Sequence, residues 1–303
     1  MTHSSNRQGP HRSTFLTSLM ALLLATLLTG CEWELFDKNA DEDDDNEEEM
    51  EPIDRASQVT GLEIGVSDLA MSLPVYRDGL DMRIVDDETT DNSRRITLES
   101  PGSPLEATLT LIEFTDGVGR NLQDNPGKIV FYTPDAEALA NQFATAGGRV
   151  TLPPTEQPGF GVVGFGRDPD NNLIEIAQND EVPLIMLTAV GIGASNLDEA
   201  RDFYRDQVGL SEQAFIPTGS YDEYIMGAPE GVRSMSLVLM HWTDDVERRY
   251  EGNETSVRLI SEDPDEVTDR TYSEEDEQTQ DLDGNRLIID DEPADLSVPE
   301  SDD

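Results

Sequence analysis

The sequence has few of the residues on which most metal and redox chemistry depends. Its 303 residues include one cysteine, Cys31, and three histidines, His3, His11 and His241. A single thiol excludes an intrachain disulfide and any zinc site built from several cysteines. A mature chain that begins at Cys31 keeps only His241. Such a chain has no site that requires two histidines.

Basic residues are also scarce. Lysine and arginine total 20 against 65 aspartates and glutamates, the net charge is −45, and the only lysines are Lys38 and Lys128. This charge repels nucleic acid and anionic lipid headgroups, so neither is expected as a partner. Acidic excess with few lysines is typical of proteins that meet high external salt, but acidic linkers alone could also produce it. The sequence leaves both explanations open.

Long hydrophobic runs are absent. The longest apolar stretch, Phe15 to Leu28, is too short to span about 30 Å of hydrocarbon. It follows Arg7 and Arg12 and ends in Leu28-Thr29-Gly30-Cys31, which resembles the lipobox of a bacterial lipoprotein. We therefore expect lipidation at Cys31 and anchoring in the cell envelope. The outer membrane is favoured, with the protein facing the periplasm or the exterior. The alternatives are an ordinary signal peptide with a chance cysteine and a short membrane anchor.

Acidic segments delimit the globular part. We predict a signal peptide at 1–30, a disordered acidic tether at 31–56 and an acidic tail at 291–303, because these like charges repel one another. Two folded domains are expected between them, at 57–180 and 181–290.

An internal repeat organises this folded part. Leu62 to Leu69 and Val190 to Leu197 each alternate apolar residues and then reach a helix N-cap, Asp68 or Asn196. A helix with a tyrosine follows in each copy, and Tyr204 lies 128 residues after Tyr76.

Each copy contains a second, weaker unit. In the first copy a strand begins at Lys128, a helix spans 136–146, and a turn at 168–172 leads into a last strand from Leu173 to Ala177. The second copy repeats only the ends of this unit, at 256–260 and 287–289. It is therefore predicted to lack the helix, with at most a turn or one short helix at 265–270.

These junctions resemble the vicinal oxygen chelate superfamily, which includes glyoxalases, extradiol dioxygenases and bleomycin-resistance proteins. The resemblance rests on Val66-Ser67-Asp68-Leu69, on Phe203-Tyr204-Arg205-Asp206, and on Asp168-Pro169-Asp170 leading to Glu175. It implies an α+β fold of two glyoxalase-like domains, built from paired βαβββ units, with the second domain abbreviated. Ligands would bind within a cup of curved sheet.

Metal-dependent members of the family place one ligand side chain on each of four strands, and the ion polarises substrate oxygens. The corresponding positions here are Gly61, Thr110, Lys128 and Glu175. In the second copy they are Ala189, Val238, Ser256 and Ile288. Only Glu175 is a good ligand, and it could hold a divalent cation only weakly. The resemblance therefore implies no metal cofactor.

The ligand-binding candidates are Glu175, Lys128, Gly61, Thr110 and Phe165, and no catalytic residue is assigned. Glu175 and Lys128 either orient a ligand or form an ion pair in a relic cup. We expect a metal-independent module that binds or sequesters a small molecule, more readily than an enzyme. The alternatives are a metal-dependent glyoxalase- or dioxygenase-type enzyme and a non-catalytic structural or interaction domain. The sequence does not identify a ligand or a protein partner.

Overall fold

The computed structural model describes residues 57–103, 107–228 and 234–291. The predicted signal peptide, Cys31 and the tether lie outside these residues, as does all but the first residue of the predicted tail. The described chain forms two large mixed sheets with helices packed against them, which confirms the α+β fold class.

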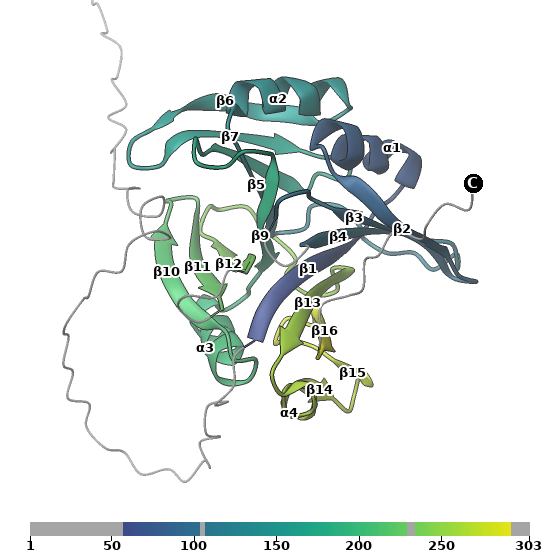
Figure 1. Ribbon diagram of the computed structural model, residues 1–303. Helices are drawn as coiled ribbons and strands as arrows, with labels where there is room; N and C mark the ends of the chain where they lie inside the picture. The colour runs from purple at the N-terminus through teal and green to yellow at the C-terminus, as the bar shows by residue number, and fades with distance from the viewer. Residues whose placement is uncertain (1–56, 104–106, 229–233, 292–303) are drawn as a thin grey trace, which may run out of the picture.

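Four successive units of one strand, one helix and further strands make up these sheets (Figure 1). The first unit contains β1 (Ser57–Gly65), α1 (Leu69–Pro74), the π-helical turn η1 (Val75–Gly79), β2 (Arg83–Thr89), β3 (Ser93–Glu99) and β4 (Thr108–Phe114). The second contains β5 (Lys128–Thr133), α2 (Ala136–Thr145), β6 (Arg149–Gln157), β7 (Gly161–Arg167) and β8 (Leu173–Gln178). The third contains β9 (Met186–Gly193), α3 (Leu197–Asp206), β10 (Ser211–Pro217), β11 (Tyr221–Gly227) and β12 (Ser236–Trp242). The fourth contains β13 (Thr255–Ser261), α4 (Pro264–Thr271), β14 (Tyr272–Ser273), β15 (Gln278–Thr279) and β16 (Arg286–Asp290).

The predicted strand-to-helix junctions are confirmed. The side chain of Asp68 accepts a hydrogen bond from the amide of Ala70, and that of Asn196 accepts one from the amide of Glu199, so both residues cap their helices. Pro74 ends the regular part of α1, because it has no amide hydrogen for the helical ladder, and the chain continues into η1.

The order of the strands shows which units share a sheet. The six-stranded sheet has the order β16-β13-β1-β4-β3-β2, and the eight-stranded sheet has the order β10-β11-β12-β9-β5-β8-β7-β6. The first unit therefore pairs with the fourth through antiparallel β1 and β13, and the second pairs with the third through antiparallel β5 and β9. Each sheet combines one unit from each half of the chain (Figure 1).

Buried tyrosine–aspartate hydrogen bonds connect the units in a different way. Tyr76 Oη in η1 donates to Asp168 Oδ2 at 2.7 Å, which joins the first unit to the turn before β8. Tyr204 Oη in α3 donates to Asp281 Oδ2 at 2.9 Å, which joins the third unit to the turn before β16. Both tyrosines are completely buried. Their position in the repeat therefore reflects packing and these hydrogen bonds.

The prediction that the second copy lacks its second helix is wrong. α4 has eight residues, slightly more than two turns. Asp263 caps it by accepting from the amide of Glu266, and Pro264 occupies the first turn, where its missing amide hydrogen costs nothing. The fourth unit is shortened in its strands, since β14 and β15 have two residues each.

The main core lies between the helices and the sheets, and its largest fully buried side chains include Phe131 of β5 and Phe143 of α2. Among the residues that the structure describes, no helix is long and apolar enough to cross a membrane.

Candidate functional site

Two of the predicted site residues, Lys128 and Glu175, form the centre of a buried charged group in the eight-stranded sheet. Lys128 Nζ on β5 donates to Glu175 Oε2 on β8 at 2.9 Å. Glu223 Oε2 on β11 lies 2.8 Å from the same nitrogen, at an angle outside hydrogen-bond geometry, so charge attraction holds it there. The side chains of Lys128, Glu175 and Glu223 are 5%, 17% and 3% exposed. One ammonium therefore lies between carboxylates from the second and third units.

The burial of this triad changes the proton affinity of its members. Burial alone would lower the pKa of the Lys128 ammonium, but the carboxylates of Glu175 and Glu223 outweigh it and hold that pKa well above its usual range. Burial raises the pKa of Glu223, and Lys128 opposes that rise. The ammonium thus remains charged, and the fully ionised triad carries one net negative charge.

Apolar side chains surround the triad and fill the inner face of the eight-stranded sheet. We call this set the inner cluster; it consists of Val130, Leu173, Ala189, Tyr221, Ile225, Val238 and Met240, with Tyr132, Phe165, Ala214, Ile216 and Trp242 packed against it. Ile216 on β10 also contacts the small cluster of Phe160, Val163 and Ala177 near β7. Because β10 and β7 stand near opposite ends of the strand order, the sheet curls so that β10 approaches β7.

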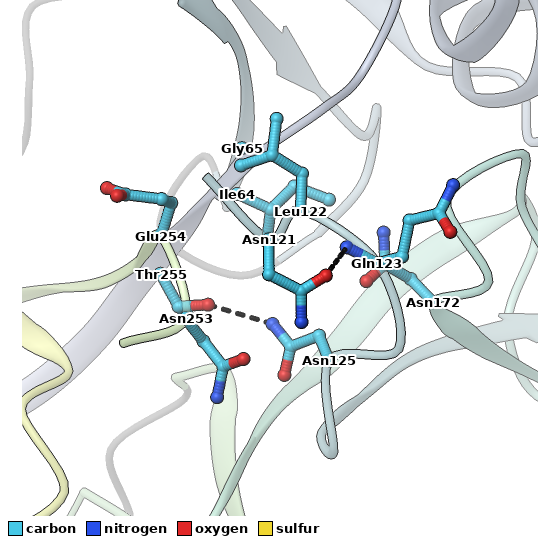
Figure 2. Close-up of a pocket in the computed structure, with 10 residues that line it drawn as sticks. All are labelled: Ile64, Gly65, Asn121, Leu122, Gln123, Asn125, Asn172, Asn253, Glu254 and Thr255. Carbon is cyan, nitrogen blue, oxygen red and sulfur yellow. Dashed lines mark hydrogen bonds between the residues drawn. The ribbon is translucent and has the colours of Figure 1, made fainter. Parts of the chain in front are cut away.

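The described part of the molecule has little open space near the triad. One cavity that Lys128 lines has about 10 Å³, room for a single water molecule. A second cavity of the same size lies where β1, the loop before β5 and the loop before β13 meet, and Figure 2 shows that amide side chains line much of it. Asn125 there donates to Thr255 Oγ1 at 2.8 Å. These spaces are too small for an organic ligand in this conformation.

Gly61 and Thr110 do not join the other predicted site residues. Both lie in the six-stranded sheet, Gly61 on β1 and Thr110 on β4, whereas Lys128 and Glu175 lie in the eight-stranded sheet. A Cβ at Gly61 would lie 2.5 Å from Thr108 Oγ1 and 2.9 Å from the Thr108 carbonyl oxygen, so this glycine permits the close approach of β1 and β4. Thr110 is buried, and its hydroxyl lies 3.0 Å from that of Thr97.

The face of the six-stranded sheet that carries Thr110 has its own charged group. Glu63 is 2% exposed, and its Oε1 accepts from Arg95 at 2.6 Å and from Arg258 at 3.1 Å. Arg258 also donates to Asp290 at 2.9 Å. This network ties β3, β1, β13 and β16 together across the junction of the first and fourth units.

Glu223 was missed because its strand belongs to the second copy, where the family positions carry no ligand. The alternation of side chains along β11 nevertheless contained a signal for it. Tyr221, Glu223 and Ile225 occupy every second position and so share one face of β11. A glutamate in the middle of such an apolar face requires a buried partner, and Lys128 provides it.

Phe165 and His241, the other two residues considered, both pack against neighbouring side chains or backbone. Phe165 on β7 stands directly opposite Glu175 on β8 and packs against the inner cluster. His241 is partly buried; its Nδ1 lies 2.9 Å from the Ala194 carbonyl oxygen, and its ring stacks on Tyr250.

The residues present do not fit the divalent ion of the metal-dependent members. The ion would have to occupy the space where Lys128 Nζ already contacts both available carboxylates. Ala189 and Val238, at the positions expected to face it from the third unit, supply no ligand atom. Within 57–103, 107–228 and 234–291, no three histidine, cysteine, aspartate or glutamate side chains gather as metal ligands.

Comparison with known proteins shows what the chain resembles. The Glyoxalase/Bleomycin resistance protein/Dioxygenase superfamily model matches residues 57–176. The crystal structure of glyoxalase I from Zea mays superposes with a TM-score of 0.62 at 16% identity, over 78% of this chain and 92% of that one. A point mutant of the same maize enzyme gives a TM-score of 0.61 at 17% identity, over 78% of this chain and 94% of that one.

These two likenesses establish the fold. A search of curated proteins found no match to the chain. A structure of a glyoxalase/bleomycin resistance/dioxygenase domain from Frankia sp. is 28% identical, over 40% of this chain and 96% of that one, with a TM-score of 0.34. Residues 57–176 therefore form a domain of the Glyoxalase/Bleomycin resistance protein/Dioxygenase superfamily.

Proposed function

We propose that this protein is a metal-independent, non-catalytic member of its superfamily that binds or sequesters a small molecule at the cell envelope. The observation that supports it best is the Lys128 ammonium, 2.9 Å and 2.8 Å from the carboxylates of Glu175 and Glu223. An ammonium donates hydrogen bonds but has no empty orbital with which to coordinate a substrate oxygen as a metal ion does, so this site favours metal-independent binding.

The inner cluster defines the ligand class in this proposal. Glu175 keeps 17% of its side chain exposed, and Tyr132, Phe165 and Trp242 around it are partly exposed. A flat apolar ligand with one polar group would stack on these rings and direct that group to Glu175 and Lys128. The rings would have to separate on binding, since the cavity beside Lys128 holds only one water molecule.

A second candidate function is a non-catalytic structural or interaction domain. The filled inner face favours it, because Ile216 packs against the cluster of Phe160 and Val163 and the described cavity beside Lys128 holds a single water molecule. The third candidate, a metal-dependent enzyme, would require stoichiometric metal in the purified protein.

A thermal-shift screen of small molecules against the full mature chain, at low and high salt, tests the proposal. We expect planar aromatic compounds with a polar group to raise the melting temperature. Lys128→Met should weaken their binding by about 1.5–3 kcal/mol, the range for a hydrogen bond to a charged group. Glu274→Gln, at an exposed position, is the control and should leave affinity unchanged.

A ligand whose affinity is unchanged by both Lys128→Met and Glu175→Gln would place the site elsewhere. If no compound of this class binds, the interaction-domain function is favoured.

The envelope location is a separate part of the proposal and rests on Cys31. We expect Cys31→Ser to yield an unprocessed or soluble protein, whereas the wild-type chain fractionates with membranes and incorporates labelled fatty acid. Normal membrane fractionation of Cys31→Ser would refute the lipid anchor.

A further inference from the structure

The charge balance of the buried triad carries an inference that rests on the metal-independence proposed above. Two carboxylates and one ammonium share a site enclosed by Val130, Tyr221 and the rest of the inner cluster. Two ionised carboxylates at such short range in an apolar site must be compensated by a cation or a proton. Lys128 supplies that compensation from within the chain.

The position of the ammonium is as informative as its charge. Oxygens of both Glu175 and Glu223 lie within 3 Å of Nζ, and the Tyr221 ring centroid lies 5.6 Å away. Carboxylate oxygens hold divalent ions at about 2.0–2.6 Å, so small side-chain movements would convert this ammonium site into a metal-ion site. The two carboxylates come from different units, which pair through β5 and β9.

We infer that Lys128 is an internal substitute for a metal ion. It excludes divalent cations from the eight-stranded sheet, and its removal uncovers a divalent-cation site on Glu175 and Glu223. The uncovered site would take a hard or borderline ion, since its ligands are carboxylate oxygens completed by water. Glu223 is essential to the inference because Glu175 alone would hold an ion only weakly.

The test compares the full mature chain with Lys128→Ala, which removes the ammonium and leaves space for an ion with its water molecules. Mn²⁺ and Zn²⁺ are the probes. Binding is followed by isothermal titration calorimetry, by the electron paramagnetic resonance signal of free Mn²⁺ and by thermal shift. A salt concentration of about 1 M suppresses nonspecific binding to the acidic surface, because the Debye length is then about 3 Å.

We expect one tight equivalent of Mn²⁺ or Zn²⁺ in Lys128→Ala, with an apparent affinity at least about tenfold above that of the wild type, and a higher melting temperature with the ion. Adding Glu223→Gln or Glu175→Gln to that variant should abolish the gain. Lys128→Arg retains the positive charge and is the matched control; it should gain no site.

Lys128→His keeps the experiment decisive if Lys128→Ala does not fold, because the imidazole fills part of the space and is itself a metal ligand. Folding of either variant only with metal would also support the inference. Folded variants that bind no more metal than the wild type would overturn it while leaving the proposed function intact. Tight stoichiometric metal in the wild type would instead overturn the metal-independence itself.

Discussion

At the scale of single residues, the buried carboxyl groups differ in how their charge is compensated. Glu175 and Glu223 share an ammonium, whereas Asp281 has no cationic partner within hydrogen-bond distance among the described residues. Its carboxyl accepts from Tyr204 Oη, from the Asn285 side chain and from the amides of Asp283 and Asn285. Burial is the largest effect on its pKa and raises it to about 6, although the hydrogen bonds from Asn285 and Tyr204 oppose the rise.

We predict from Asp281 that stability changes with pH in the mildly acidic range. The folded state binds this proton more tightly than the unfolded chain, whose pKa is about 3.9. The contribution is therefore fully present below about pH 4 and is lost as the pH rises through about 6, with a total of about 3 kcal/mol. Chemical unfolding of the wild type and of Asp281→Asn at several pH values measures it. The variant should show a weaker pH dependence, and Glu274→Gln should match the wild type. Parallel curves for wild type and Asp281→Asn would contradict the prediction.

The residue chemistry of the site could be predicted only in part. Counting from the turn motif placed Lys128 and Glu175 correctly beside each other, because β5 and β8 belong to the same unit and their register is local. Glu223 could not be placed, since its proximity to Lys128 arises from the pairing of the second and third units. Gly61 and Thr110 were assigned to the same site because the family resemblance places one residue on each of four strands, but both lie in the other sheet.

At the scale of elements, the antiparallel pairing of β5 and β9, which we call the seam, brings the strands of the triad together. Gly127 lies just before β5 and Gly191 lies within β9, and the two backbones approach so closely that a Cβ at Gly127 would collide with the carbonyl group of Gly191. Apolar alternation and helix caps predicted the individual elements well, because these are local properties. α4 was underestimated because its sequence is polar, and packing through the buried Val267 compensates for that.

The seam provides a prediction at this scale. Gly127→Ala should destabilise the protein by about 3 kcal/mol or more, because the obstructing atoms are backbone and cannot rotate away. Gly119→Ala is the matched control; a Cβ there meets nothing within 4 Å, and it should change stability little. Urea unfolding of both variants provides the comparison. Equal stability of Gly127→Ala and Gly119→Ala would show that the seam tolerates the added methyl group.

At the scale of the whole molecule, acidic residues far outnumber basic ones, and the net charge of the full sequence is −45. Exposed ion pairs such as Arg94–Asp87 are individually weak, so they relieve little of the repulsion. Mutual repulsion of the remaining carboxylates opposes the compact state. The paired-unit architecture was predictable from the repeat, whereas the exchange of partners between the two halves was not, because each unit carries the same local pattern.

We predict that salt stabilises the protein. The melting temperature should rise by several degrees between about 0.1 M and 1 M NaCl, as the Debye length falls from about 10 Å to 3 Å. KCl should act equally if screening is the cause. A melting temperature that is constant or falls with either salt would show that repulsion among the carboxylates does not limit stability.

The pairing of the first unit with the fourth also has a consequence for the order of synthesis. The antiparallel neighbour of β1 is β13, about 200 residues further along the chain, and the neighbour of β5 is β9, which is also synthesised later. When only the first half of the chain has been synthesised, β1 and β5 therefore remain open sheet edges. Each edge could pair with a strand of another protein. Such distant pairing slows folding. If folding began only after β16 had been synthesised, β1 and β5 could pair with their own partners, and the chain would be protected from pairing with other molecules.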